Sequence, residues 1–144
     1  MESKKYRKFS NFISFLLGVF AMKDVFDFIE TLTNYNNSTM LAKYVLIAQG
    51  FFVVGVVLLI AFYFILLENI KKRGVFIRRN EKIMRYFGFS ILILGTTSMI
   101  ICNYWTKEST TSARMLALIG GTLIFVSYIF RIGIEIQEEQ DLTI

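Results

Sequence analysis

The stretch that decides the fold is residues 44–67, "YVLIAQGFFVVGVVLLIAFYFILL". Its one strongly polar interior residue is Gln49. About 20 apolar residues in helical form cross a hydrocarbon core of about 30 Å. A chain inside lipid has to satisfy its backbone polar groups within itself, and a helix does this. The stretch therefore predicts a transmembrane helix.

Three further apolar segments accompany it, at about residues 9–33, 86–105 and 113–134. Aromatic side chains, which favour the headgroup boundary, stand at several segment ends: Tyr44, Tyr86, Tyr104 and Trp105. The chain is 55% hydrophobic, more than is usual in a soluble domain, and has no proline. We therefore predict an all-α fold: one integral membrane domain over residues 1–144, forming a left-handed antiparallel four-helix bundle without β structure.

The first segment has two interpretations. Residues 9–22 are apolar, but charged residues follow within 23–30, and the basic N-terminus ahead of them imitates a signal peptide with Ala21 as the last residue before cleavage. Amphipathic spacing continues through Leu32, which favours an uncleaved helix. A cleaved signal peptide stays open as the alternative.

Basic residues in the short connections set the orientation. Eleven flank the membrane on one side: Lys4, Lys5, Arg7, Lys8, Lys71, Lys72, Arg73, Arg78, Arg79, Lys82 and Arg85. The other side has three: Lys43, Lys107 and Arg114. Both termini and the middle loop are therefore expected to be cytoplasmic.

The middle loop and the C-terminal tail carry opposite charge on this same side. Residues 68–85 contain seven basic and two acidic residues, and residues 135–144 contain four acidic ones. Exposed ion pairs contribute only about 0–1 kcal/mol each, and the anionic inner leaflet competes for the loop at about 1 kcal/mol per basic residue. A solvated helix end beside ordinary topology-setting cations is the favoured interpretation. A tail that latches onto the loop is the alternative.

The latch hypothesis makes specific predictions. The tail folds back beneath the bundle, Glu135 and Glu138 face the loop, and Leu142 and Ile144 are buried around Val75 and Phe76. The candidate partner-binding residues on this face are Arg73, Phe76, Arg78, Arg79, Glu135, Glu138, Glu139, Asp141 and Leu142. For the loop itself, we expect Gly74 to end the second helix and Asn80 to cap the third.

The tail "GIEIQEEQDLTI" (133–144) resembles the closing signature of the membrane family called domain of unknown function 2975. The loop is similar too, with "LLENIKKR", then Gly74 and Phe76, then "RRNEKIMR". The resemblance covers the four-span layout, but the chain departs from it in a short first outer loop and in lacking a proline near the outer end of span one. It implies a small multi-pass protein of the bacterial plasma membrane and a cytoplasmic regulator of the Cro type as partner. It supplies no catalytic residues.

A second candidate site lies near the outer end of the first segment, where Lys23, Asp24, Asp27 and Glu30 sit within two helical turns. Charges within a membrane segment are costly and often functional. A salt-bridged cluster within reach of water is favoured. A pocket for an external cation or peptide and a proton-coupled transport site are the alternatives.

Polar and small residues in the other segments point to helix packing. Ala113, Ala117 and Gly121, with Gly120 beside them, form a small-residue stripe that favours packing within the bundle over a second copy. The residues expected to form interhelical hydrogen bonds are Gln49, Thr96, Thr97 and Ser98.

Enzymatic chemistry finds no support in the sequence. One cysteine, Cys102, and no histidine exclude an internal disulfide and a Cys/His zinc site. Phosphate-loop, nucleophile-elbow and metal-helix patterns are missing. We therefore expect no catalytic residue, no metal and no cofactor.

The favoured function is a non-enzymatic membrane accessory or regulatory protein that binds a cytoplasmic regulator or another membrane complex. Its basic loop also meets anionic lipid, and no direct contact with nucleic acid is expected. The alternative is a small oligomeric transporter or channel that uses Asp24 and Asp27. A homo-oligomer stays open in both cases.

Overall fold

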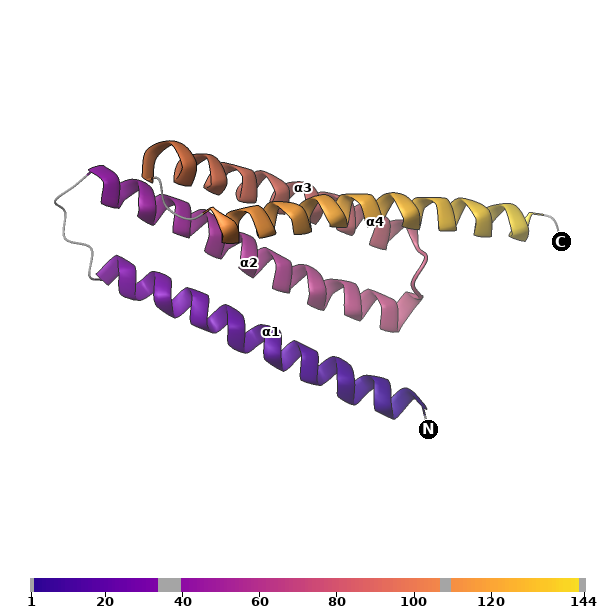
Figure 1. The fold of residues 1–144 in the computed structure, drawn as a ribbon. Coiled ribbons are helices and arrows are strands. Elements are labelled where there is room, and N and C mark those ends of the chain that lie inside the picture. The colour runs from indigo at the N-terminus through magenta and orange to yellow at the C-terminus, as the bar shows by residue number, and fades with distance from the viewer. Residues whose placement is uncertain (1, 34–39, 107–109, 143–144) are drawn as a thin grey trace.

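The computed structural model describes residues 2–33, 40–106 and 110–142, and nearly all of this part of the chain is helical (Figure 1). The elements are α1 (Glu2–Thr33), α2 (Met40–Arg73), α3 (Arg78–Ile101), the π-helix η1 (Cys102–Thr106) and α4 (Thr111–Asp141). No strand occurs among the described residues. The predicted all-α fold with four long helices is therefore confirmed, and α1 continues past Ala21 as one helix.

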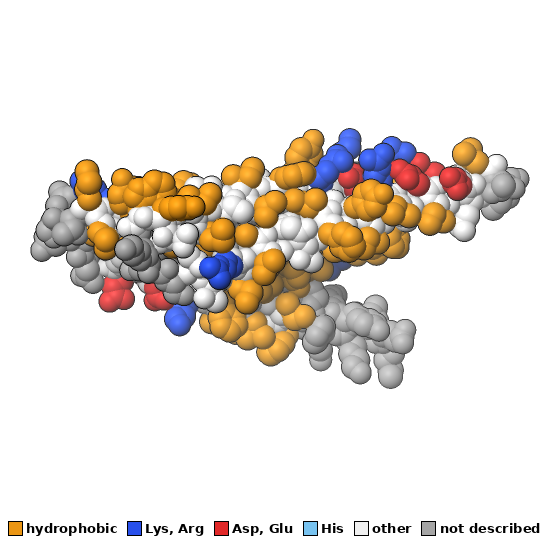
Figure 2. Space-filling view, turned by 45° about the horizontal axis from the view of Figure 1, so that its top comes forward, with side chains coloured by type: hydrophobic (Ala, Val, Ile, Leu, Met, Phe, Trp, Pro, Cys, Tyr) orange, Lys and Arg blue, Asp and Glu red, His pale blue; other side chains and the backbone are white. Residues whose placement is uncertain are grey.

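Within the described residues, three helices are long and apolar enough to cross a membrane: Met40–Lys72, Arg78–Trp105 and Thr111–Asp141. Apolar side chains cover much of the surface in Figure 2, while basic and acidic ones gather towards the C-terminal part of α4. Large contiguous apolar surfaces are rare on water-soluble monomers. The protein is therefore of the membrane class.

Helices α3 and α4 form the tightest pair. A Cβ atom on Gly95 would lie 2.5 Å from the backbone nitrogen of Ala117, and one on Gly120 would lie 2.5 Å from that of Leu92. The small-residue stripe thus packs within the molecule, as expected, at Ala117 and Gly120. Gly121 differs from the prediction, since a Cβ atom there would have no neighbour within 4 Å.

Helix α2 packs across this pair. Leu116 of α4 fills the space beside Gly55, where a Cβ atom would come within 2.5 Å of its Cδ2. The rings of Phe62 and Phe87 lie 5.6 Å apart, joining α2 to α3. Ile91 of α3 is fully buried. These contacts make α2, α3 and α4 a compact three-helix unit.

Helix α1 packs against α2 alone among the described helices. In Figure 1 it diverges from the other helices towards its N-terminus. The four helices are therefore a packed unit of three with α1 at its side, rather than an evenly packed bundle.

The polar residues expected to join helices behave differently from one another. The Ser98 hydroxyl of α3 donates a hydrogen bond to the carbonyl oxygen of Ala48 in α2, at 3.0 Å. The Thr96 hydroxyl instead donates to Leu92 of its own helix, at 2.8 Å, so that prediction is wrong. Helical Thr hydroxyls reach the carbonyl four residues back without help from a neighbour.

The middle loop turns at Gly74, whose positive φ of 96° ends α2 as predicted. Asn80 is not the N-cap of α3, because the helix begins at Arg78 and Ile77 occupies the cap position. The Asn80 side chain is fully buried and its amide donates to the carbonyl oxygens of Gly74 (3.2 Å) and Val75 (2.9 Å). It therefore clamps the turn from inside the third helix.

Candidate functional site

The middle loop is held against α4 by Phe76. Its ring lies 5.2 Å from that of Phe130, centroid to centroid. It also covers Gly133, where a Cβ atom would come within 3.0 Å of the ring. Because residue 133 is a glycine, the Phe76 ring of the loop can pack directly on the backbone of α4.

The tail does not fold back towards the contact between Phe76 and α4. Helix α4 continues to Asp141, and Leu142 is 87% exposed. From Gly133 to Leu142 a helix rises about 13–14 Å, at about 1.5 Å per residue. The straight helix therefore carries Leu142 past the loop, and the predicted burial of Leu142 around Val75 and Phe76 is wrong. Ile144 lies outside the described residues.

A bidentate ion pair joins Arg78, at the start of α3 beside the loop, to Glu138 in the tail. The Arg78 guanidinium donates from Nε to Glu138 Oε1 at 2.9 Å and from Nη2 to Oε2 at 2.7 Å. Such paired geometry is the strong form of an arginine–carboxylate contact. The hydrogen bonds hold the pKa of the Glu138 carboxyl below its ordinary value and raise the pKa of Arg78. The loop–tail contact expected by the latch hypothesis is therefore present at Glu138.

Two further ion pairs on this face are local, each within one helix. Glu135 accepts from Arg131 of its own helix at 3.0 Å, rather than from the loop. Arg85 pairs with the nearly buried Glu81 at 3.2 Å. Both pairs are four residues apart, the spacing at which helical side chains meet without any tertiary contact.

Four of the nine candidate partner-binding residues line one shallow depression of about 270 Å³. We call its lining the loop–tail platform: Phe76, Ile77, Arg78, Ile134, Gln137, Glu138 and Asp141. Of the remaining candidates, Arg79, Glu135, Glu139 and Leu142 are exposed beside or beyond it. The side chain of Arg73 lies outside the described residues.

A second groove of about 200 Å³ lies next to the platform, between α3 and α4. Its lining is mostly charged: Arg78, Glu81, Lys82, Arg85, Arg131, Ile134 and Glu135. Four cations against two carboxylates make it basic. It lies where the apolar parts of α3 and α4 end.

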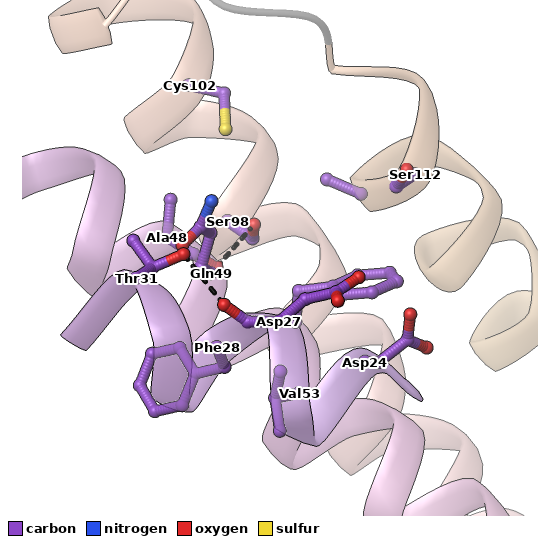
Figure 3. A pocket seen from close by; sticks show the side chains of 12 residues that line it. Asp24, Asp27, Phe28, Thr31, Ala48, Gln49, Val53, Ser98, Cys102 and Ser112 are labelled. Atoms are coloured by element: carbon purple, nitrogen blue, oxygen red, sulfur yellow. Dashed lines mark hydrogen bonds between the residues drawn. The ribbon is translucent and has the colours of Figure 1, made fainter. Parts of the chain in front are cut away.

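The outer charged residues separate into two pairs. Asp24 and Asp27 line a cavity of about 260 Å³ between α1 and the other helices (Figure 3). Asp24 is half-buried and Asp27 is exposed at the cavity mouth, whereas Lys23 and Glu30 do not line the cavity. No ion pair joins these four side chains among the described residues. The favoured salt-bridged cluster is therefore not formed here.

Sequence reasoning missed two features of these sites. The clamp by Asn80 was missed because an asparagine near a helix start looks like an N-cap, whereas Asn80 lies three residues after the actual cap position, Ile77. The cavity walls from Ser98 and Cys102 were missed because they depend on how α3 faces α1. The available hint was that the polar residues Gln49 and Ser98 lie five and seven residues from the same end of their segments, at Tyr44 and Trp105.

Comparisons with protein families, with characterised proteins and with solved structures found no match to this chain. The class of the protein is thus the one its own helices define, an all-helical membrane protein.

Proposed function

We propose that the protein is a non-enzymatic, four-span membrane protein that binds a partner protein through the loop–tail platform on its cytoplasmic face. The bacterial plasma membrane is its location, and a cytoplasmic regulator or a second membrane complex is its partner. The observation that carries this proposal is the joining of loop and tail, two segments distant in sequence, by the Arg78–Glu138 ion pair and the Phe76 contacts.

The arrangement of the helices supports the topology. The N-terminus, the connection between α2 and α3, and the C-terminus all lie at one end of the molecule (Figure 1). Counting Arg131 of α4, this end also holds twelve of the sixteen basic residues by sequence position. With α1 as the fourth span, the positive-inside rule then makes this end cytoplasmic.

The shape of α4 supports a docking role. Its last turns extend beyond the other helices in Figure 1 and expose both carboxylates and apolar side chains, including Ile136 and Leu142. Because Arg78 and Phe76 fix α4 against the loop, a partner meets a surface that is already ordered. Preorganisation of this kind lowers the entropy cost of binding.

Anionic lipid is the second partner of the same face. The basic groove beside the platform, which Lys82 and Arg85 line, supports this proposal. Basic residues near an anionic leaflet contribute about 1 kcal/mol each. The lipid contact anchors the face and leaves the platform directed at the cytoplasm.

Isolation of the protein from native membranes in mild detergent tests the proposal. We expect the wild type to bring a partner with it and Asp141→Lys, which reverses charge on the platform, to lose it. Arg114→Glu, a charge reversal at the opposite end of the molecule, is the matched control and should retain the partner. Recovery of the wild type alone would count against the proposal.

A further inference from the structure

The outer cavity is built by all four helices, although α1 itself packs only on α2. The space left between α1 and the ends of α3 and α4 is the cavity. Its walls come from all four helices and η1: Asp24, Asp27, Phe28 and Thr31 of α1, Ala48, Gln49, Phe52 and Val53 of α2, Ser98 of α3, Cys102 of η1, and Ser112 and Ala113 of α4. Figure 3 shows Asp24 and Asp27 on one helix and Gln49 and Ser98 on the facing helices.

The cavity lies near the outer membrane boundary. Tyr44 of α2 stacks on Trp105 of η1, with ring centroids 5.7 Å apart, and such aromatic pairs mark the headgroup level. Gln49 is five residues further into α2, which places it about 7–8 Å below that level. A solute from the outer aqueous phase therefore has a short path to it.

Two of the three hydroxyl groups that line the cavity, those of Ser98 and Thr31, already donate inside the protein. The Ser98 hydroxyl donates to the Ala48 carbonyl at 3.0 Å, and the Thr31 hydroxyl donates to the Asp27 carbonyl at 2.8 Å. Both hydrogen bonds are drawn in Figure 3. Neither hydroxyl proton is left for a ligand.

The acceptors, by contrast, have no donor among the described residues. The side-chain oxygen of Gln49 is buried and has no hydrogen-bond donor among the described residues. The carboxylates of Asp24 and Asp27 have no ion-pair partner there either, and no lysine or arginine lines the cavity. A buried acceptor without a donor costs about 1–3 kcal/mol, so the site is suited to a ligand that donates hydrogen bonds and carries positive charge.

Two phenylalanine side chains add aromatic and apolar surface to the cavity wall. Phe28 and Phe52 are among the lining residues, and aromatic faces attract organic cations as well as hydrocarbon. No group of three His, Cys, Asp or Glu side chains with metal-binding geometry occurs in the described part of the chain. The lining therefore suits an ammonium group on a short hydrocarbon body better than a metal ion.

We propose that this cavity binds a small aliphatic amine from the outer side of the membrane. Its ammonium groups donate to the Asp24 and Asp27 carboxylates, and its methylene groups lie against Phe28 and Phe52. Two carboxylates favour a diamine over a monoamine. The site is separate from the loop–tail platform and does not depend on any cytoplasmic partner.

Titration calorimetry on the purified protein in detergent, with 1,4-diaminobutane as the probe, tests the proposal. We expect saturable binding by the wild type, weaker binding of butylamine, and no binding of butyrate. The isosteric double variant Asp24→Asn, Asp27→Asn should lose at least about tenfold in affinity, because it removes both charges. Glu30→Gln on the same helix, which does not line the cavity, is the matched control and should bind as the wild type does.

A second variant tests the cavity independently, in case the double aspartate variant fails to fold. Ser112→Leu narrows the cavity from α4 without touching a carboxylate, and it should also weaken diamine binding while leaving the helical circular dichroism unchanged. Absence of saturable binding by the wild type would overturn the proposal. So would equal binding by the wild type and the double aspartate variant, or full competition by sodium ions at the same concentration as the amine. Because no partner protein is present, each result is independent of the platform.

Discussion

Substituting alanine for Gly120 is the sharpest test of the helix packing. The new Cβ atom would lie 2.5 Å from the backbone nitrogen of Leu92, 2.8 Å from its Cα atom and 2.9 Å from the carbonyl oxygen of Gly88. All three neighbours are backbone atoms, so no side chain can rotate away. Helix α4 has to move about 1 Å from α3 to restore an ordinary contact, and overpacking of this kind costs about 1–3 kcal/mol.

Gly121→Ala is the matched control, one residue along the same helix. Its Cβ atom would have no neighbour within 4 Å. Alanine in a helix is favoured over glycine by about 0.5–1 kcal/mol, so this variant should be unchanged or slightly stabilised. The measurement is the free energy of unfolding of the purified protein in detergent or bicelles. Equal stability of the two variants would refute the close approach of α3 and α4.

Three further predictions concern the loop–tail end of the molecule and the proposed topology. Asn80→Leu removes both hydrogen bonds that clamp the turn and should cost about 1–3 kcal/mol of unfolding free energy, with faster protease cleavage of the middle loop as the readout; unchanged cleavage would contradict the clamp. Because Arg78 lowers the pKa of Glu138, the ion pair should persist at neutral pH and be lost as the pH falls through that lowered pKa; spin labels on the loop and on α4 should then separate, and an identical transition in Glu138→Gln would argue against this assignment. In a Cys102→Ala background, single cysteines replacing Asn37 or Glu108 should react with an impermeant maleimide from outside intact cells, and protection of both would exclude the proposed topology.

The helices were predictable from the sequence because their signal is local. Apolar runs of sufficient length predict spanning helices wherever they occur, and Gly74 with its positive φ is a local stop signal. The ion pair between Arg78 and Glu138 was within reach for a related reason. The positive-inside rule predicts that both residues lie on the same face, and the helix period pointed to Glu135 and Glu138, of which Glu138 makes the contact while Glu135 pairs with Arg131.

The predictions from the sequence that were wrong all depended on tertiary geometry. The fold-back of the tail was argued from the apolar character of Leu142, but the straightness of α4 decides where that residue lies. The role of Asn80 depends on the path of the turn before it, and the use of Gly120 rather than Gly121 depends on the rotation of α4 against α3. A single sequence contains the apolar periodicity but not the rotation of one helix against another.

The central claim, that loop and tail form one partner-binding platform through Arg78 and Glu138, is tested most directly by exchanging the two charges. We expect Arg78→Glu and Glu138→Arg each to reduce recovery of the partner from native membranes, because each places like charges at a contact of 2.7 Å. The double variant restores the pair in reverse and should restore recovery. Wild-type recovery by both single variants, or a double variant as poor as either single one, would contradict the account.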